Sequence, residues 1–319
     1  MLIDEFLDKS SKLRHNFFPD KRTSIDPRKN TKDDSFYYYP GRIWLDTDGH
    51  PIQAHGGGIL YDEKSRMSYW YGEYKNGPTY RAPGKNVARV DIIGVGCYSS
   101  KDLWTWKNEG IVLAEEEKNE AHDLHNNSPT GPFRYLYSKR PHGFESRDMT
   151  LFKDEDGRAY VIYSSVHNRE LHIGLLDEDY VDVTNDMSTV LVGQYRESPA
   201  LFKYHGTYYM ITSGCSGWAP NEVLAHVAES IMGPWETIGN PCIGANKVFR
   251  VTTFFAQSTY VLPISPGSFI FMADRWNPDD LGESRYVWLP LTVEEVAGSQ
   301  QPRVSIYWHK RWKLLKSQA

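Results

Sequence analysis

Short runs of apolar and aromatic residues alternate with polar turn residues along most of this chain, a pattern that predicts many short β-strands. From Tyr37 onward, these runs end in Gly, Asp, Asn or Pro, the residues that close strands with tight turns. Three segments repeat one order of strand, short polar turn and aromatic strand: 56–73, 148–165 and 197–214. A fourth, 252–275, fits the same order with a longer turn. The chain is therefore predicted to be all-β.

The spacing of these repeats favours a β-propeller. Asp148 and Glu197 stand at equivalent positions 49 residues apart, and Gln257 follows Glu197 by 60 residues. Periods of this size in an all-β chain are typical of propellers, whose four-stranded blades surround a central channel. A β-sandwich with similar hairpins is the alternative. Residues 1–36 are charged and lack apolar periodicity, so we expect a flexible leader followed by a single domain over 37–319.

The second repeat is shorter than the others. The outer-strand pattern of the first repeat ends at Leu113, and the next such pattern begins at Ser128. The interval between them is acidic and has no aromatic strand, whereas later repeats have a full aromatic hairpin in the corresponding place. The second blade is therefore predicted to lack its inner strands.

Composition narrows the function classes. The 319 residues carry a formal net charge of −5, which argues against nucleic-acid binding, because such surfaces are basic. Aromatic residues make up 14% of the chain, enough for a large core and for rings that stack on sugars. Three cysteines exclude a disulfide framework. No apolar run is long enough to span a membrane. His122 and His125 lack a third ligand at regular spacing, so we expect no metal or other cofactor.

Candidate catalytic groups come from the starts of the repeats, because the innermost strand of each propeller blade begins beside the central channel. Two starts carry an Arg followed by a carboxylate, Arg147-Asp148 and Arg196-Glu197, and a third carries Gln257. Glycosidic cleavage needs one acid to protonate the leaving oxygen and a second group to manage water. Turn-capping acids paired with the neighbouring Arg side chains are the alternative interpretation.

Four further residues are candidates for substrate binding. Glu73 ends an aromatic strand beside Tyr71, where it could bind sugar hydroxyls next to a stacking ring; a solvent-facing strand end is the alternative. Trp218 and Asn221 lie in a loop after an aromatic strand, where ligand contacts are common. A packing role for Trp218 is equally compatible with the pattern.

These motifs resemble glycoside hydrolase family 43 and, more narrowly, its exo-β-1,3-galactanase (galactan 1,3-β-galactosidase) subfamily, with the plant members most similar. The resemblance spans about residues 37–314, and its motifs are IQAHGGGILYD, YWYGEYK, SRDMTLFKDEDG, SPALFK, TYYMITSG and TTFFAQSTYV. It implies a five-bladed β-propeller, here with an incomplete second blade that the plant relatives fill with an aromatic hairpin. It also implies an inverting hydrolase that releases terminal galactose from the β-1,3-galactan of arabinogalactan-type glycans.

The resemblance implies roles for single residues as well. Glu197 corresponds to the general acid, and Asp148 to the residue that tunes the pKa of that acid. The usual aspartate base of the first blade is absent, because HGGG (55–58) occupies its position. Gln257 and Glu73 remain as candidates beside the attacking water. We expect Gln257 to position the water and Glu73 to recognise the substrate.

Other functions stay open at this stage. A catalytically impaired carbohydrate-binding propeller fits the shortened second blade. A family-43 arabinofuranosidase or xylosidase is disfavoured, because those enzymes keep the first-blade aspartate. The expected partner is a galactan or arabinogalactan oligosaccharide, with no nucleic acid and no membrane segment in this chain. The resemblance implies the Golgi or the secretory pathway, although the chain shows no signal or anchor, and the sequence leaves the oligomeric state open.

Overall fold

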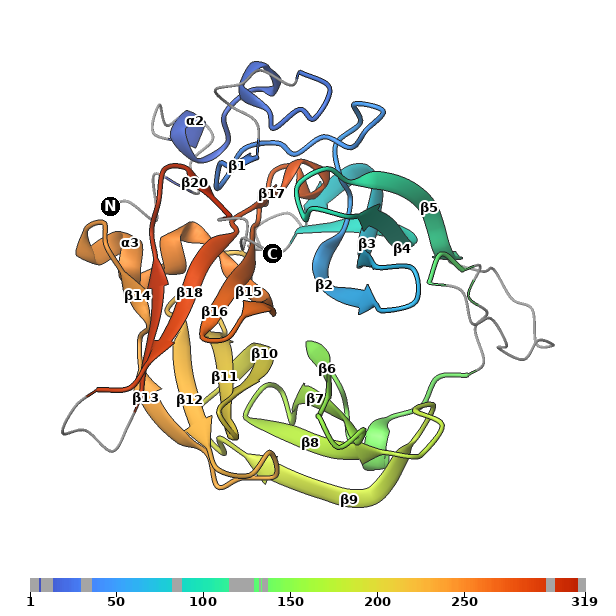
Figure 1. Ribbon diagram of the computed structural model, residues 1–319, viewed down its shortest axis with the longest axis vertical. Helices are drawn as coiled ribbons and strands as arrows, with labels where there is room; N and C mark the ends of the chain where they lie inside the picture. Colours follow the sequence, from blue (N-terminus) through green and yellow to red (C-terminus); the bar gives the residue numbers. More distant parts are fainter. Residues whose placement is uncertain are drawn as a thin grey trace.

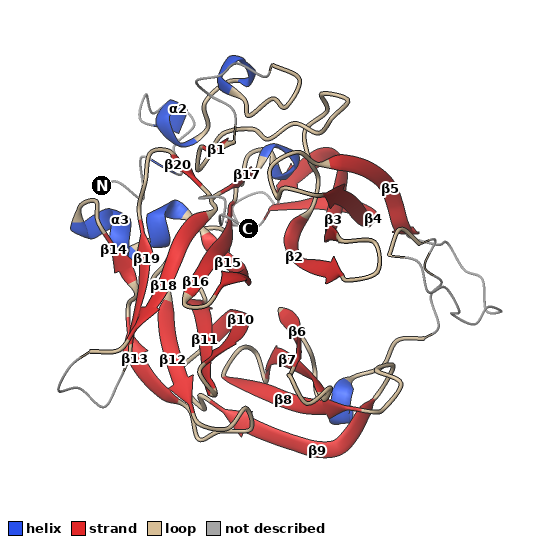
Figure 2. Ribbon diagram, in the orientation of Figure 1, coloured by secondary structure: helices blue, strands red, loops and turns tan. Residues whose placement is uncertain are grey.

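Four antiparallel or mixed sheets are arranged around a central axis, which makes the molecule a β-propeller (Figure 1). The computed structural model describes residues 6, 14–29, 36–81, 88–114, 129–131, 133, 137–296 and 302–314. Strands dominate these ranges, and the helices are short and peripheral (Figure 2). The prediction of an all-β propeller is confirmed.

Three of the sheets are four-stranded meanders in chain order. The first contains β2 (His55–Asp62), β3 (Met67–Arg81), β4 (Ala88–Ser100) and β5 (Lys107–Ala114). The second contains β6 (Met149–Lys153), β7 (Ala159–Ser165), β8 (Glu170–Leu176) and β9 (Val183–Val190). The third contains β10 (Arg196–Tyr204), β11 (Thr207–Gly214), β12 (Leu224–Ala228) and β13 (Glu236–Gly239).

The fourth sheet has the order β14-β19-β18-β16-β15, with β17 paired to β16. Its strands are β14 (Cys242–Ile243), β15 (Gln257–Ser265), β16 (Ser268–Arg275), β17 (Arg285–Tyr286), β18 (Leu289–Glu294) and β19 (Arg303–Tyr307). A two-stranded ribbon joins β1 (Tyr37–Tyr38) to β20 (Trp312–Lys313). The helical turns are α2 (Arg14–Phe17), η1 (Lys21–Thr23), η2 (Pro141–Gly143), α3 (Lys247–Val251), η3 (Thr253–Phe255) and η4 (Leu281–Glu283).

The first hairpin of each repeat follows from local sequence. In the β10–β11 hairpin, Tyr204 pairs with Thr207 across a two-residue turn. Its central residues, His205 and Gly206, have positive φ values of 49° and 78°. A two-residue turn with positive φ at both positions matches the right-handed twist of the flanking strands better than a type I or type II turn does. The seven residues of β7 are all buried, because propeller blades pack on both faces.

The core consists of separate apolar clusters between neighbouring sheets. The largest lies between the β10–β13 and β14–β19 sheets. A second, rich in tryptophan, lies between the β2–β5 and β14–β19 sheets and includes Trp44, Trp70, Trp106 and Trp288. A third lies between the β6–β9 and β10–β13 sheets. Burial of these aromatic and aliphatic side chains contributes hydrophobic free energy that holds the sheets together.

The described part of the chain forms four blades, one fewer than the resemblance implies. No described strand lies between β5 and β6, where the incomplete second blade is expected. On β6, Met149 and Leu151 are 53% and 63% exposed, large values for apolar side chains on an inner strand. The interval 115–128, with His122 and His125, lies outside the described residues.

The expected leader is packed on the propeller where the structure describes it. Phe17 is buried against Phe255 with ring centroids 4.3 Å apart, and Ile25 bridges to Trp44. Arg14 forms an ion pair with Asp279 at 2.7 Å. These contacts differ from the expectation of a flexible segment, because they join residues too far apart in sequence for local patterns to reveal. None of the helices in the described ranges has the length and apolarity needed to span a bilayer.

Candidate active site

The inner strands of three sheets bring Asp148, Glu197 and Gln257 towards the central axis. Asp148 directly precedes β6, Glu197 is the second residue of β10, and Gln257 is the first residue of β15. The ends of these strands face one another around the centre of the ring (Figure 1). The repeat pattern predicted this convergence, because equivalent positions in successive blades lie at the same level of the channel.

The Glu197 carboxyl group is held by two amide donors. Gln257 Nε2 donates to Oε1 at 3.0 Å, and Asn168 Nδ2 donates to Oε2 at 2.9 Å. Asn168 lies in the turn between β7 and β8 and is itself buried. Both carboxyl oxygens therefore have fixed positions between three blades.

Its surroundings favour the protonated form of Glu197. Burial, and next the negative charge of Asp148, raise the pKa of Glu197 to about 7, against hydrogen bonds from Cys215 and Gln257 that lower it. Asp148 is itself fixed by the Ser198 hydroxyl, which donates to its Oδ2 at 2.6 Å. A carboxyl group that keeps its proton near neutral pH is suited to act as a general acid.

The Gln257 side chain is fixed at both ends of its amide. Nε2 donates to Glu197 and also to Ser213 Oγ, at 3.0 Å, while Oε1 accepts from the Trp276 indole N–H at 2.7 Å. Across the β15–β16 ladder, Gln257 pairs with Asp274. The amide oxygen therefore has one remaining lone pair for a further donor, such as a water molecule.

Glu73 reaches the same group of residues through Lys75. The Glu73 side chain is 45% exposed and forms an ion pair with the buried Lys75 ammonium group. That ammonium nitrogen lies 5.0 Å from the centroid of the Trp276 ring, the same ring whose N–H binds Gln257. A half-exposed carboxylate at the edge of the site can accept hydrogen bonds from sugar hydroxyls.

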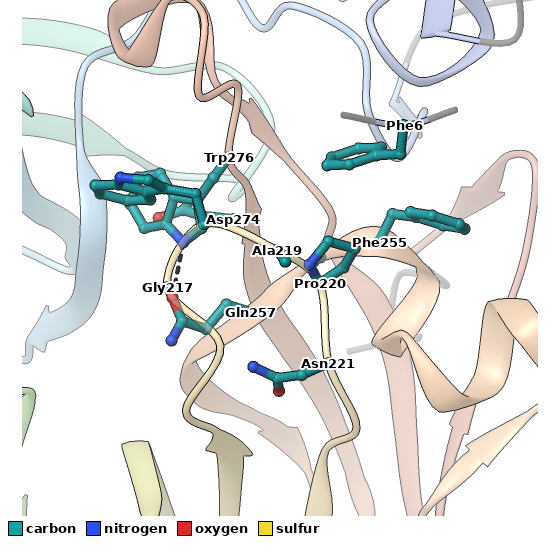
Figure 3. A pocket seen from close by; sticks show the side chains of 11 residues that line it. Phe6, Gly217, Ala219, Pro220, Asn221, Phe255, Gln257, Asp274 and Trp276 are labelled. Carbon is teal, nitrogen blue, oxygen red and sulfur yellow. Dashed lines mark hydrogen bonds between the residues drawn. The ribbon is translucent and has the colours of Figure 1, made fainter. Parts of the chain in front are cut away.

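Trp218 and Asn221 line a small hollow together with Gln257, Asp274 and Trp276. Figure 3 shows Asn221, Gln257, Asp274 and Trp276 around this hollow. The Trp218 ring meets Trp276 at 5.4 Å in an edge-on arrangement, and its indole N–H donates to the Ala88 carbonyl at 3.0 Å. The Asn221 amide bonds to both backbone groups of Gly214, at 2.7 and 2.8 Å. Both residues therefore shape this loop, and their substrate-binding roles remain predictions.

Tyr71 contacts residues other than the Glu197 and Gln257 group. Its hydroxyl donates to the Pro129 carbonyl at 2.6 Å. Its ring packs in a small apolar cluster that includes Cys97, Val112 and Phe133. A hydroxyl already paired with a backbone carbonyl has less capacity to bind a sugar.

Sequence reasoning missed Asp274 and the way it meets the HGGG segment. Asp274 is buried, accepts from the Gly56 N–H at 2.6 Å and lies 3.3 Å from His55 Nδ1. Burial lowers the pKa of His55, so its ring is neutral, and it stacks on Tyr286 at 4.7 Å. At Gly57, a Cβ would come within 1.9 Å of the Tyr71 carbonyl oxygen. Close packing therefore accounts for glycine at this position.

No group of three or more His, Cys, Asp or Glu side chains within the described ranges is arranged to hold a metal ion. The residues assembled here are carboxyl, amide, indole and hydroxyl groups. Together they can protonate a leaving oxygen, hold a water molecule and bind sugar hydroxyls.

Comparisons with known proteins agree with this chemistry. The family model for glycosyl hydrolases family 43 matches residues 114–247. A solved family-43 β-1,3-galactosidase bound to galactodeoxynojirimycin has 34% sequence identity and a TM-score of 0.75, covering 87% of this chain and 100% of its own. An exo-β-1,3-galactanase from Phanerochaete chrysosporium, solved with β-1,3-galactotriose, has 30% identity and a TM-score of 0.72, covering 88% of this chain and 69% of its own.

A curated protein also matches, over a shorter range. The β-D-galactofuranosidase xynD of Aspergillus niger is 27% identical over 182 residues, which is 54% of this chain. The match spans about half (52%) of that relative's length. It supports a glycosidase without indicating the same sugar.

Proposed function

This chain belongs to glycosyl hydrolase family 43, and we propose that it releases terminal galactose from the β-1,3-galactan of arabinogalactan-type glycans with inversion of configuration. The observation that carries the proposal is the Glu197 carboxyl group, which has a pKa raised to about 7 and is fixed between Asn168 and Gln257. The galactosidases and galactanases among its structural neighbours support the choice of sugar.

In the proposed reaction, protonated Glu197 transfers its proton to the glycosidic oxygen as the bond to the galactose C1 breaks. Asp148 keeps that proton in place until substrate arrives, because its charge disfavours ionised Glu197. A water molecule attacks C1 from the opposite side of the ring, which inverts the anomeric configuration. Glu73 binds the hydroxyls of the terminal galactose.

Gln257 takes the part of the missing carboxylate base in this proposal. A neutral amide is a very weak base, but its oxygen can accept the proton of the attacking water if its nitrogen gives one up. Nε2 already points a hydrogen at Glu197 Oε1 at 3.0 Å. Once Glu197 has become a carboxylate, it can take that hydrogen while Oε1 of Gln257 takes the water proton. The exchange leaves Gln257 as its imidic acid and Glu197 protonated, and return of Gln257 to the amide completes the cycle.

The test of the proposal is hydrolysis of β-1,3-galactobiose followed by proton NMR. Inversion predicts that α-galactose appears first and only later equilibrates with the β-anomer. Early β-galactose would contradict inversion, and faster cleavage of an α-arabinofuranoside or a β-xyloside would contradict the substrate. Family-43 arabinofuranosidases and xylosidases keep the first-blade aspartate, whereas this chain has HGGG (55–58) in its place. This difference supports galactan as the substrate over arabinofuranosides and xylosides.

A carbohydrate-binding propeller without turnover is the second candidate. It is favoured by one observation, the missing sheet between β5 and β6 in the described part of the chain. Saturable binding of β-1,3-galactobiose with no release of galactose over a day would support it and overturn the hydrolase proposal.

Replacing Asp148 with asparagine should move the alkaline limb of the pH–rate profile to lower pH. A general acid works only while protonated, so activity falls as the pH rises through the pKa of Glu197, about 7. Loss of the Asp148 charge lowers that pKa and makes the fall begin earlier. The measurement is kcat/KM between pH 4 and 9 for the variant and for Asp186→Asn, an exposed acid on β9. An unchanged profile in Asp148→Asn would reduce Asp148 to a structural role.

Replacing Gln257 with alanine should lower kcat much more than it changes KM. An interaction that acts mainly on the attacking water contributes in the transition state rather than in the bound ground state. Loss of an aligned hydrogen-bonding group at a reacting centre costs about 10²–10³-fold in kcat. Trp276→Phe is the matched variant, since it keeps a ring but removes the N–H that orients Gln257, and we expect a smaller loss of the same kind. A rise in KM at constant kcat would make Gln257 a binding residue.

A further inference from the structure

A second and much larger cavity lies at the rim of the β14–β19 sheet, away from the centre of the ring. Its volume is about 330 Å³, within the range of about 300–1,000 Å³ that small-molecule sites occupy. Its walls come from α2, the turn after β1, α3, the end of β16 and the segment after β19. In Figure 1, α2, β1 and α3 are at the upper left, outside the ring of inner strands.

This rim cavity is separate from the candidate active site. Asp274 and Arg275 are consecutive residues of β16, and successive strand residues point to opposite faces. Asp274 lines the hollow beside Gln257, whereas Arg275 lines the rim cavity. Phe255 lines the hollow and Phe17 lines the rim cavity, and their rings are in contact. The wall between the two spaces is therefore aromatic and closed at this point.

The rim cavity carries positive charge, and none of the described residues that line it is a carboxylate. Three cations line it, Arg42, Arg275 and Lys310. Arg275 is 2% exposed and donates to the carbonyls of Phe17, Phe254 and Phe255. These bonds engage one N–H on each of its three nitrogens, and no carboxylate of the described residues forms a salt bridge with it, which is uncommon for a buried cation. Burial, and next the Arg285 charge, lower the pKa of Arg275 to about 9, so it stays charged at neutral pH.

The other two cations are available to a ligand. The Arg42 guanidinium lines the rim cavity and lies 3.8 Å from the centroid of the Tyr39 ring. Lys310 is exposed, and no salt bridge to either side chain occurs within the described ranges. The chain as a whole has a net charge of −5, so the positive charge around the rim cavity is a local feature of the surface.

An aromatic surface accompanies these charges. Trp308 lines the rim cavity and is held edge-on by Phe249 at 5.3 Å. It is partly buried, with part of its surface facing the space. A ring face beside a cation suits a ligand that is both apolar on one side and anionic, whereas a bare inorganic anion would gain nothing from it.

We propose that the rim cavity binds an acidic sugar, a pyranose ring that carries a carboxylate, with the carboxylate on Arg42 and Lys310 and the ring against Trp308. This site is additional to the proposed hydrolysis and does not depend on it. A glycan that reaches both places would be held by an acidic unit while a terminal unit enters the ring centre.

The test is titration of the full chain with methyl β-glucuronide, monitored by calorimetry or by ligand NMR, with methyl β-galactoside and inorganic phosphate as the other probes. We expect the glucuronide to bind at least about tenfold more tightly than either, because only it offers both a carboxylate and a ring face. Lys310→Glu and Arg42→Gln should each weaken it by about tenfold or more, as the loss of a charge-assisted hydrogen bond does. Lys101→Gln, at another exposed lysine, should change nothing.

The outcomes separate this proposal from the proposed function. Glu197→Gln should bind the glucuronide as the unaltered chain does, and Lys310→Glu should keep its full rate on β-1,3-galactobiose. Equal binding of phosphate, equal binding of the galactoside, or glucuronide binding unaffected by Lys310→Glu would each overturn the proposal. Absence of glucuronide binding would do so too, whether or not the protein hydrolyses galactan.

Discussion

Glu197→Gln should lower kcat on β-1,3-galactobiose by about 10²–10⁴-fold, the usual contribution of a positioned general acid, while the fold stays intact. Glutamine has nearly the same shape and still offers an oxygen to Asn168 or Gln257, the two amides that hold Glu197. It cannot release a proton to the glycosidic oxygen. The loss therefore falls on the chemical step, and galactobiose binding should change little.

An activated substrate separates loss of acid catalysis from general damage. An aryl β-galactoside with a leaving group that needs no protonation should lose far less rate than galactobiose in the Glu197→Gln variant. The melting temperature should match that of the unaltered chain. If both substrates slowed equally, or if galactobiose turnover stayed near normal, the assignment of Glu197 as the acid would be wrong.

Restoring an aromatic hairpin between Ala114 and Pro129 should raise both stability and activity. The exposed Met149 and Leu151 side chains on β6 would be covered by a new blade, and burial of an aliphatic side chain is worth about 1.5–3 kcal/mol. Because these two side chains are only 53% and 63% exposed, covering them gives roughly 2–3.5 kcal/mol in total, which corresponds to a rise in melting temperature on the order of 3–5 °C. Closure of the ring would also limit access of water to the central site, and we expect a higher galactanase rate.

A matched insertion tests whether the hairpin acts as a blade. A segment of the same length made of Gly and Ser forms no strands, so it should leave the melting temperature unchanged or lower it. Thermal unfolding and the initial rate on galactobiose are measured for the original chain and both insertions. Equal melting temperatures and equal rates in all three would show that the gap is harmless and that the interpretation of an incomplete blade is wrong.

Local sequence patterns predicted the hairpins well. The segments 148–165 and 197–214 correspond closely to β6–β7 and β10–β11, because alternation and turn residues act between neighbours in the chain. The fourth segment was predicted to begin at 252, but β15 begins at Gln257. The residues before it, Thr253 to Phe255, have φ between 52° and 60°. Such a turn in non-glycine residues leaves no sequence signal and is imposed by packing.

The candidate site was predictable only in part. Repeat spacing was sufficient to select Asp148, Glu197 and Gln257, because equivalent positions in a propeller converge. Asn168 was not predictable, since its turn matches no motif, and neither was Trp276, whose partner Gln257 lies on another strand. Their roles depend on contacts with residues that are distant in sequence and that only the folded chain brings together. The packing of Arg14 against Asp279 was missed for the same reason.

The junction between the first and last sheets has a consequence for the order in which the chain folds. Tyr286 bonds to both Ile52 and Ala54, and Gly56 bonds to Asp274, across sequence separations of 234, 232 and 218 residues, respectively. Contacts that close such long loops carry a large entropic cost and form slowly. The β6–β9 and β10–β13 sheets, built from near neighbours, can form before this junction does. A refolding experiment should therefore show strand formation well before the fluorescence change of the buried tryptophans at that junction, Trp70 and Trp288, and hydrolytic activity should return only with the later phase.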